Sequence, residues 1–355
     1  MSTKAMIFVF LALSCFGLAS SFTCVTVGYS PNASYKVPSP ASDALFYMKS
    51  AISTFKNNGG GCLMIEEGVY KMSSYIEFPG NTTVVGAGMD KTILRLKDYA
   101  TPWWIAGTGN KRSGFIRAMD VSNLVFANFT IDGNRENQNT DKYSEYGRYG
   151  FYTEACVNVT VDGMTVRNFQ GYGFDPHGDK QSMTWSNYLT IMNSRSENNG
   201  WDGYTIDQTY NALLRNNTSI GNGRHGFNIV TGSRYITMVD NTATNNGFWY
   251  YKNSSGCGIM IQNNYEFGTG NVSISNSVIT NSTDAGMCIT EVFNIIALNN
   301  SITKTANNVC MRLRNVTNGV VAYTTCAGAS RGITVTTSTN VSVTNTTKLA
   351  RKLLM

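Results

Sequence analysis

The sequence predicts an all-β protein, a parallel β-helix whose short strands stack coil on coil, with one α-helix capping the N-terminal end. Two repeating patterns support this prediction, one marked by residues that open strand-like segments and one marked by glycines. The composition agrees, because 34 glycines, 6 prolines and 14% charged residues are typical of short strands joined by polar turns.

The first pattern is the residue, mostly asparagine, that opens each strand. Most gaps between successive openers are 22 to 24 residues long, and two are enlarged to 29 and 36. Self-similarity at a fixed length indicates stacked coils, and the sequence shows neither a leucine-rich pattern nor a 3.6-residue period. The predicted openers are Asn158, Asn187, Asn211, Tyr235, Asn271, Asn294, Asn318 and Asn340.

The second pattern is a glycine that follows each opener and begins a segment of alternating character. The first and third residues after the glycine are apolar, as in Phe174 to His177 and Tyr204 to Asp207. Alternation at period two places these residues inside the coil and their neighbours outside it. The glycines are Gly173, Gly203, Gly226, Gly258, Gly286 and Gly332.

The N-terminal region is predicted to direct export. Residues 1–20 have the features of a secretory signal, with Lys4 ahead of an apolar run that is too short to span a bilayer. The expected product is a secreted, extracellular or cell-wall protein with no membrane anchor. Of eight cysteines, Cys15 leaves with the signal, so at least one thiol of a monomer stays unpaired in an oxidising compartment.

Residues 21–41 are predicted to be a leader, and the β-helix is predicted to be a single domain over residues 42–347. It starts with a helix near Ser42. The apolar residues of this helix recur at the spacing of one helical face, and the helix would cover an open end of the sheet. Residues 348–355 form a basic tail. Several Asn-x-Ser/Thr triplets predict a glycoprotein, although most of them also fit the strand pattern.

The outward positions of three successive coils bring polar residues together. Neighbouring strands lie about 4.8 Å apart, so His177 is expected beside Asp207, and Arg224 is expected to face solvent without a partner. Two interpretations of Asp202 and Asp207 stay open, since these residues either hydrogen-bond turns or orient the histidines, or they take a direct role. The predicted exterior patch consists of Tyr172, Asp175, His177, Asp202, Asp207, Arg224, His225 and Asn228.

Two polar loops are predicted to wall this patch. Trp249 lies in an aromatic run that would stack on sugar rings or, alternatively, cover a coil edge. Lys142 lies in the other loop, between Arg135 and Tyr149. The net charge of +6 suits an anionic partner, or solubility alone.

The motif Tyr172-Gly173-Phe174-Asp175-Pro176-His177 resembles the catalytic module of mannuronan 5-epimerases, the alginate-modifying enzymes. Three further stretches are similar to the same module: Thr130 to Asn134, Asn199 to Gly203 and Arg224 to Thr231. The resemblance covers roughly residues 40–340 and is strongest over 128–232. It implies a right-handed, pectate-lyase-like β-helix acting on an anionic polysaccharide, with no nucleic-acid or membrane partner.

The resemblance also implies roles for individual residues. Tyr172, Asp175, His177 and Arg224 would be catalytic, and Lys142 and Asp207 would contact or support the substrate; we add Asp202, His225, Asn228 and Trp249 as substrate-binding residues. The family implies calcium as a cofactor and no organic cofactor, but calcium-binding nonapeptide repeats do not occur in these 355 residues. No metal ligands and no oligomeric state are predicted.

The expected reaction inverts carbon 5 of a uronate, which removes a proton next to a carboxylate and returns one on the opposite face. Arg224 and Asp175 would stabilise the intermediate, while His177 and Tyr172 would be the base and the acid in either order. The same intermediate can expel the neighbouring sugar, so an alginate lyase is the alternative. A carbohydrate-binding or wall protein without activity is the third reading.

Overall fold

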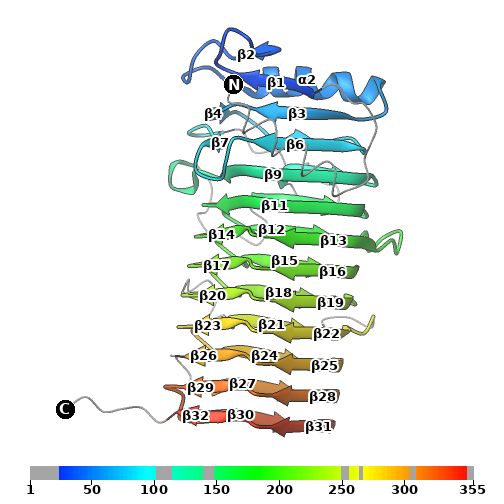
Figure 1. Cartoon of the computed structure of the whole chain (residues 1–355), viewed down its shortest axis with the longest axis vertical. Coiled ribbons are helices and arrows are strands. Elements are labelled where there is room, and N and C mark those ends of the chain that lie inside the picture. The colour runs from blue at the N-terminus through cyan, green and yellow to red at the C-terminus, as the bar shows by residue number, and fades with distance from the viewer. Residues whose placement is uncertain are drawn as a thin grey trace, which may run out of the picture.

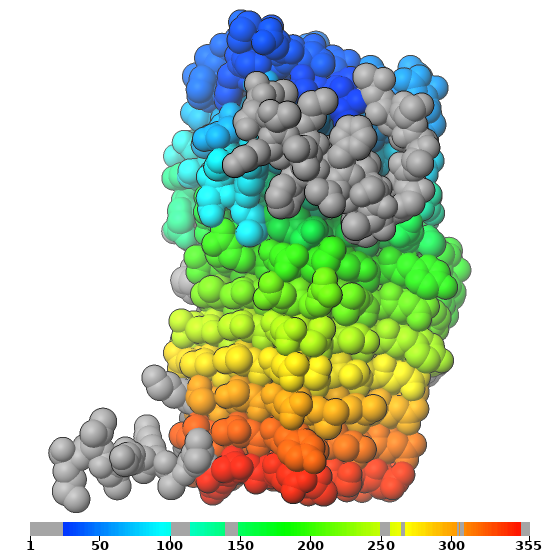
Figure 2. Space-filling model, in the orientation of Figure 1, coloured from blue at the N-terminus to red at the C-terminus, as the bar shows by residue number. Residues whose placement is uncertain are grey.

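The computed structural model describes residues 24–100, 114–138, 148–248, 256–263, 267–303, 305 and 309–349. These residues form the predicted parallel β-helix, with coils stacked along one axis from the N-terminal to the C-terminal end (Figure 1). In the space-filling view the coils follow one another as bands of colour along the same axis (Figure 2). The all-β class, the parallel pairing and the single capping helix are therefore confirmed.

The strands form two sheets, and all pairings between the named strands are parallel. The smaller, ten-stranded sheet contains β5 Ile76–Glu77, β8 Gly114–Met119, β10 Tyr149–Glu154, β12 Phe174–His177, β15 Tyr204–Asp207, β18 Phe227–Val230, β21 Ile259–Gln262, β24 Met287–Thr290, β27 Val309–Arg314 and β30 Arg331–Thr336.

The 22-stranded sheet wraps the rest of each coil. It contains β1 Cys24–Gly28, β2 Tyr35–Lys36, β3 Gly61–Ile65, β4 Gly68–Met72, β6 Thr82–Gly86, β7 Thr92–Leu96, β9 Ser122–Asp132, β11 Val157–Arg167, β13 Ser186–Met192, β14 Arg195–Glu197, β16 Thr209–Arg215, β17 Thr218–Ile220, β19 Arg234–Val239, β20 Thr242–Thr244, β22 Gly270–Ser275, β23 Val278–Thr280, β25 Phe293–Leu298, β26 Ser301–Thr303, β28 Thr317–Ala322, β29 Thr325–Ala327, β31 Thr339–Thr344 and β32 Thr347–Leu349.

Aromatic side chains stack inside the coils at the positions that the glycine pattern predicts. Phe174 stacks on Tyr204 with ring centroids 4.7 Å apart, and Tyr204 stacks on Phe227 at the same distance. Each of these rings is fully buried, and burying a large apolar side chain contributes about 1.5–3 kcal/mol. This internal stack holds β12, β15 and β18 in register, so their outward residues align as well.

The strand openers form ladders of side-chain amides. Asn294 donates to Asn271 at 2.8 Å, Asn318 donates to Asn294 at 3.1 Å, and Asn340 donates to Asn318 at 2.7 Å. These asparagines have left-handed backbone conformations, with φ between 52° and 60°, which asparagine tolerates better than most residues. The turn therefore explains why asparagine recurs in the sequence.

One predicted opener is wrong by one residue. Val157 pairs with Asn187, so the ladder position opposite Asn158 belongs to Tyr188, which has the left-handed φ of 56°. The Asn187 side chain accepts hydrogen bonds from the Tyr188 amide at 3.0 Å and from Asn211 at 2.8 Å. Asn187 thus continues the amide ladder from the neighbouring position, which is why the sequence pattern points to it.

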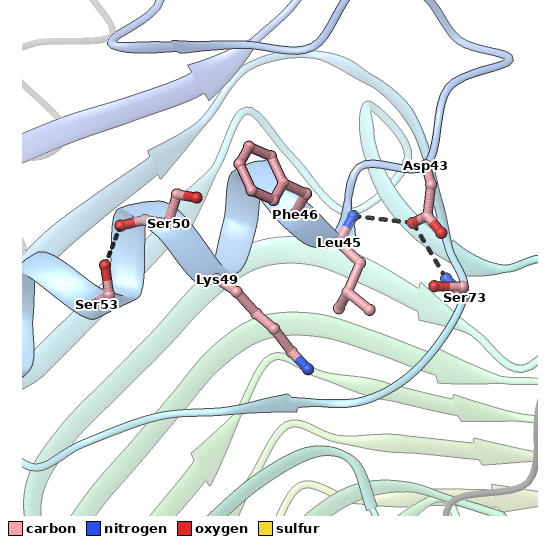
Figure 3. Close-up of a pocket in the computed structure, with 7 residues that line it drawn as sticks. All are labelled: Asp43, Leu45, Phe46, Lys49, Ser50, Ser53 and Ser73. Atoms are coloured by element: carbon pink, nitrogen blue, oxygen red, sulfur yellow. Dashed lines mark hydrogen bonds between the residues drawn. The ribbon is translucent and has the colours of Figure 1, made fainter.

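The capping helix α2 spans Leu45–Asn57 and lies across the N-terminal end of the stack, burying Met48, Ile52 and Phe55 against it (Figure 1). Asp43 accepts hydrogen bonds from the amides of Leu45 at 3.0 Å and Ser73 at 3.3 Å (Figure 3). A pocket of about 470 Å³ opens beside this contact, and none of its lining residues belongs to the predicted site.

The sheet begins earlier than predicted. Strand β1 (Cys24–Gly28) pairs with β3, so residues assigned to a leader belong to the first coil. A disulfide between Cys24 and Cys62 joins these two strands. At the other end, β32 runs to Leu349, two residues into the predicted tail.

Two further disulfides connect Cys257 with Cys288 and Cys310 with Cys326, while Cys156 is a buried free thiol. Three disulfides and one free thiol account for the seven cysteines after residue 20, whose odd number predicted an unpaired thiol. Among the described residues, no helix has both the length and the apolar character needed to cross a membrane.

Candidate active site

The described residues of the predicted patch lie on the outer side of β12, β15 and β18 and in the turns that precede these strands. Phe174 belongs to the inner stack, so alternation along β12 turns Asp175 and His177 outward. Tyr172 packs with Tyr149 and Tyr152 in a separate aromatic cluster on this outer side. The three coils therefore bring the phenol, the imidazole and the carboxylates together, as predicted.

The site is buried, which the prediction of an exterior patch did not anticipate. Asp175 and His177 are each 2% exposed and Asp202 is 0% exposed. Burial strengthens electrostatic interactions and makes an uncompensated charge costly. Each charged group in this cluster therefore needs a defined partner.

Asp202 is the hydrogen-bond centre of the cluster. Its carboxylate accepts two bonds from Arg224, from Nε at 2.7 Å and from Nη2 at 2.6 Å. It also accepts bonds from the His225 amide at 2.9 Å, Asn228 Nδ2 at 2.9 Å and Thr205 Oγ1 at 3.1 Å. Burial raises the pKa of Asp202, but the charge and hydrogen bonds of Arg224 and the contacts with His225 together outweigh this effect and lower the pKa to about 2.

The expectation that Arg224 faces solvent without a partner is wrong, because Asp202 on the preceding coil binds it in a bidentate manner. Asn228 is also held at both ends, since its Oδ1 accepts a bond from Gln262 at 3.1 Å. We therefore revise Asp202 and Asn228 from substrate-binding residues to residues that position Arg224.

Arg224 connects this network to Tyr172. Its Nη2 lies 3.4 Å from the Tyr172 hydroxyl, and its guanidinium lies over the Trp201 ring, 4.4 Å from the centroid. A guanidinium that donates to a phenol oxygen stabilises the phenolate form. The geometry thus prepares Tyr172 to accept a proton.

His177 contacts a hydrogen-bond acceptor at each ring nitrogen. Its Nε2 lies 2.9 Å from Asp207 Oδ2, as the strand register predicts, and its Nδ1 contacts the Gly178 carbonyl oxygen. A carbonyl oxygen only accepts, so Nδ1 carries the hydrogen of this contact, and Nε2 faces the Asp207 carboxylate. Both ring nitrogens thus have an acceptor for a hydrogen. Lys180 lies 3.5 Å from the same Asp207 oxygen.

His225 lies next to Asp202 but is held by the backbone. Its Nδ1 accepts a hydrogen bond from the Cys257 amide at 3.0 Å. Burial lowers the pKa of His225 to about 4, despite the opposing effect of Asp202. The ring also lines a cavity of about 360 Å³ that continues along the sheet toward Arg312 and Arg314.

The lowered pKa of His225 predicts an acid-sensitive fold. Unfolded histidine titrates near ~6.5, so between that pH and about 4 the unfolded chain binds a proton that the folded chain excludes. The free energy of unfolding should therefore fall by about 3 kcal/mol on acidification across this range. His225→Asn keeps an acceptor for the Cys257 amide but removes the titrating imidazole. Its free energy of unfolding, measured with urea at pH 7.5 and 4.5, should therefore lack this part of the pH dependence. An equal fall of the free energy of unfolding in the wild type and in His225→Asn would contradict the assignment of this effect to His225.

Three residues of the site were not singled out in the sequence. Tyr152 and Glu154 lie on β10, where Phe151 pairs with Phe174 and Glu154 pairs with His177. Part of the signal was present, because Gly150 and the apolar Phe151 repeat the start of the glycine pattern one coil earlier, although Thr153 is polar. Lys180 comes from the long loop after His177, and the position of its side chain depends on the path of that loop.

Two predicted residues lie outside the described part of the chain, namely Lys142 and Trp249. Their predicted contacts with substrate stay predictions.

Among the described residues, no cluster of carboxylates marks a calcium site. Calcium binds six to eight oxygen ligands, and among the described residues no three carboxylates lie within metal-ligand distance of one another. The one grouping of suitable spacing is Cys257, Asp284 and Cys288, and its two sulfurs form a disulfide.

Comparisons with known proteins agree with the β-helix fold. Residues 175–266 match the model of a right handed beta helix region. Mannuronan C5-epimerase AlgE3 of Azotobacter vinelandii is 34% identical over 199 residues, which are 54% of this chain and 10% of that protein. The chain is similar in sequence to mannuronan C5-epimerases over about half of its length. Alginate lyase 7 of the same organism is 35% identical over 201 residues, 52% of this chain and 21% of the lyase.

The comparison with solved structures also finds a mannuronan C-5 epimerase. The A-module of mannuronan C-5 epimerase AlgE4 from Azotobacter vinelandii superposes with a TM-score of 0.67 at 21% identity, covering 89% of this chain and 95% of the module. At this identity the match shows a shared fold. The sequence matches to AlgE3 and alginate lyase 7 span 10% and 21% of those proteins' length, so the likeness concerns one part of longer chains. The relatives that match in sequence are thus named as a mannuronan epimerase and an alginate lyase.

Proposed function

We propose that this protein inverts carbon 5 of mannuronate residues in polymannuronate and so produces guluronate. The observation that carries the proposal is the outer cluster of β12, β15 and β18, in which Arg224 links Asp202 to Tyr172 while Asp207 binds His177. The relation to mannuronan C5-epimerases supports the choice of substrate. An anionic polysaccharide is accordingly the proposed partner.

The first requirement of the reaction is to neutralise the substrate carboxylate, because removal of the adjacent proton adds negative charge. Arg224 is the cation placed for this task, and Asp202 holds its guanidinium in a fixed orientation through two bonds. Such a preorganised charge stabilises the developing enolate without reorganising during the reaction. Asp175, buried between Tyr152 and Thr205 in the same outward column, would assist as a hydrogen-bond donor in its protonated form.

The second requirement is a base and an acid on opposite faces of the sugar. The sequence left the order open, and the hydrogen bonds favour one order. Tyr172, whose oxygen faces the Arg224 guanidinium, would take the carbon-5 proton, and His177, which donates at both ring nitrogens, would return one. The two groups then exchange one proton with solvent before the next cycle.

An alginate lyase is the second candidate, favoured by the identity to alginate lyase 7. Elimination starts from the same enolate and breaks the bond to the 4-linked sugar. A product assay separates the two activities: unsaturated ends absorb in the ultraviolet, whereas guluronate signals in proton NMR without chain cleavage report epimerisation. Dominant unsaturated product would replace our proposal with the lyase.

Tyr172→Phe distinguishes an enzyme from a binding protein. The phenylalanine keeps the ring that packs on Tyr149 at 4.9 Å and removes only the hydroxyl. We expect turnover of polymannuronate to fall by about 10²–10⁴-fold. Tyr188→Phe is the matched control, because Tyr188 is 59% exposed on the other sheet, and its activity should equal the wild type. A protein that binds alginate but shows no product in any variant would support the non-catalytic reading.

Export stays a proposal that rests on the sequence of residues 1–20, which lie outside the described residues.

A further inference from the structure

Glu154 is a buried carboxylate beside His177 that the proposed chemistry does not yet use. It is 7% exposed and lies on β10, one coil before β12, where its backbone pairs with that of His177. Paired residues of adjacent parallel strands lie about 4.8 Å apart and point to the same face. Glu154 and His177 are therefore neighbours in one outward column.

The Tyr152 side chain confirms that the two groups lie together. Its hydroxyl donates a hydrogen bond to Glu154 Oε2, and its ring centroid lies 6.3 Å from that of His177. Tyr152 thus contacts both residues and limits where the Glu154 carboxylate can move. The same column continues with Asp207 on the next coil, so His177 lies between two carboxylates.

We propose that Glu154 is a positioning residue which, together with Asp207, keeps His177 in its doubly protonated form. The catalytic meaning of this inference rests on the proposed function, in which His177 returns a proton to carbon 5. Asp207 acts through a direct contact with Nε2, and Glu154 acts through its charge on the opposite side of the ring.

The charges around His177 decide how large this effect is. From β10 the ring faces Tyr152 and Glu154, from β15 it faces Asp207, and from the following loop it faces Asp179 and Lys180. Lys180 opposes the acidic groups and is itself bound to Asp207. An opposite charge within about 4–6 Å of a titrating group favours its charged form by one to three pH units, and more so where water is excluded. The contribution of Glu154 should therefore be measurable.

The chain holds only two histidines, which makes the test direct. In protein labelled at histidine, the His225→Asn background leaves one imidazole, and its NMR titration reports His177 alone. Glu154→Gln should lower the His177 midpoint by about one pH unit. Glu197→Gln is the control, because Glu197 lies in the other sheet, and it should leave the midpoint unchanged. An unchanged midpoint in Glu154→Gln would overturn the proposal.

Glu154→Asp separates charge from shape. It keeps the carboxylate, so it should restore at least half of the shift, whereas equal shifts in Glu154→Gln and Glu154→Asp would show a structural role and overturn the proposal. If polymannuronate is a substrate, the alkaline limb of the kcat profile should move to lower pH in Glu154→Gln, with KM changed less than kcat. If Glu154→Gln lowers the His177 midpoint as expected but the wild type does not convert polymannuronate, the proposed function is rejected and the Glu154 assignment stands.

Discussion

Replacing His177 by alanine is expected to lower kcat on polymannuronate by about 10²–10⁴-fold, the range that a positioned acid or base contributes. The imidazole is held by Asp207 and the Gly178 carbonyl oxygen, and the substitution removes the group that we assign to return the proton. KM should change far less, because the lost interaction acts mainly in the transition state. Product formation can be followed by proton NMR over a range of substrate concentrations.

Thr237→Ala is a suitable control for this substitution, because Thr237 is exposed on β19 in the other sheet and should not affect turnover. Thermal unfolding of both variants shows whether each is folded. A folded His177→Ala variant with full activity would show that His177 does not transfer the proton.

Removing the Asp202 side chain is expected to produce the largest loss of stability. Asp202→Ala leaves the Arg224 charge in the site without its bidentate partner and removes the acceptor of the His225 amide. Breaking a buried ion pair in this way costs about 3–5 kcal/mol in the free energy of unfolding. Activity should fall as well, since Arg224 loses its fixed orientation. Urea unfolding at pH 7 measures the stability change.

Asp90→Asn is the control for Asp202→Ala, because it breaks an ion pair that is exposed to solvent. Asp90 pairs with Arg195 at 2.8 Å, but its side chain is 77% exposed. A solvent-exposed pair of this kind contributes about 0–1 kcal/mol. A similar, small effect for Asp90→Asn and Asp202→Ala would mean that the Arg224 network does not stabilise the fold.

The repeat pattern was enough to predict the arrangement of the coils. Glycine and the alternation after it reflect the packing of each coil on the next, so Phe174, Tyr204 and Phe227 were aligned correctly. The contact between His177 and Asp207 followed from this register alone. Asn187 shows the limit of the method, since its amide joins the ladder although Tyr188 occupies the turn position.

The partners within the site were harder to predict. Arg224 binds Asp202 through side-chain geometry that a strand pattern does not contain. Lys180 reaches Asp207 from a loop, whose path is not set by any repeat. Glu154 was not predicted although Gly150 marks its coil, because Thr153 interrupts the apolar alternation and this coil contains no histidine.

Incubation of the protein with polymannuronate in D₂O, followed by NMR of the polymer, tests the central claim most directly. If the Tyr172 and His177 groups exchange the proton at carbon 5 from opposite faces, guluronate signals will grow without chain cleavage and the new residues will carry deuterium at carbon 5. A polymer that keeps its mannuronate signals and gains no deuterium would contradict the account.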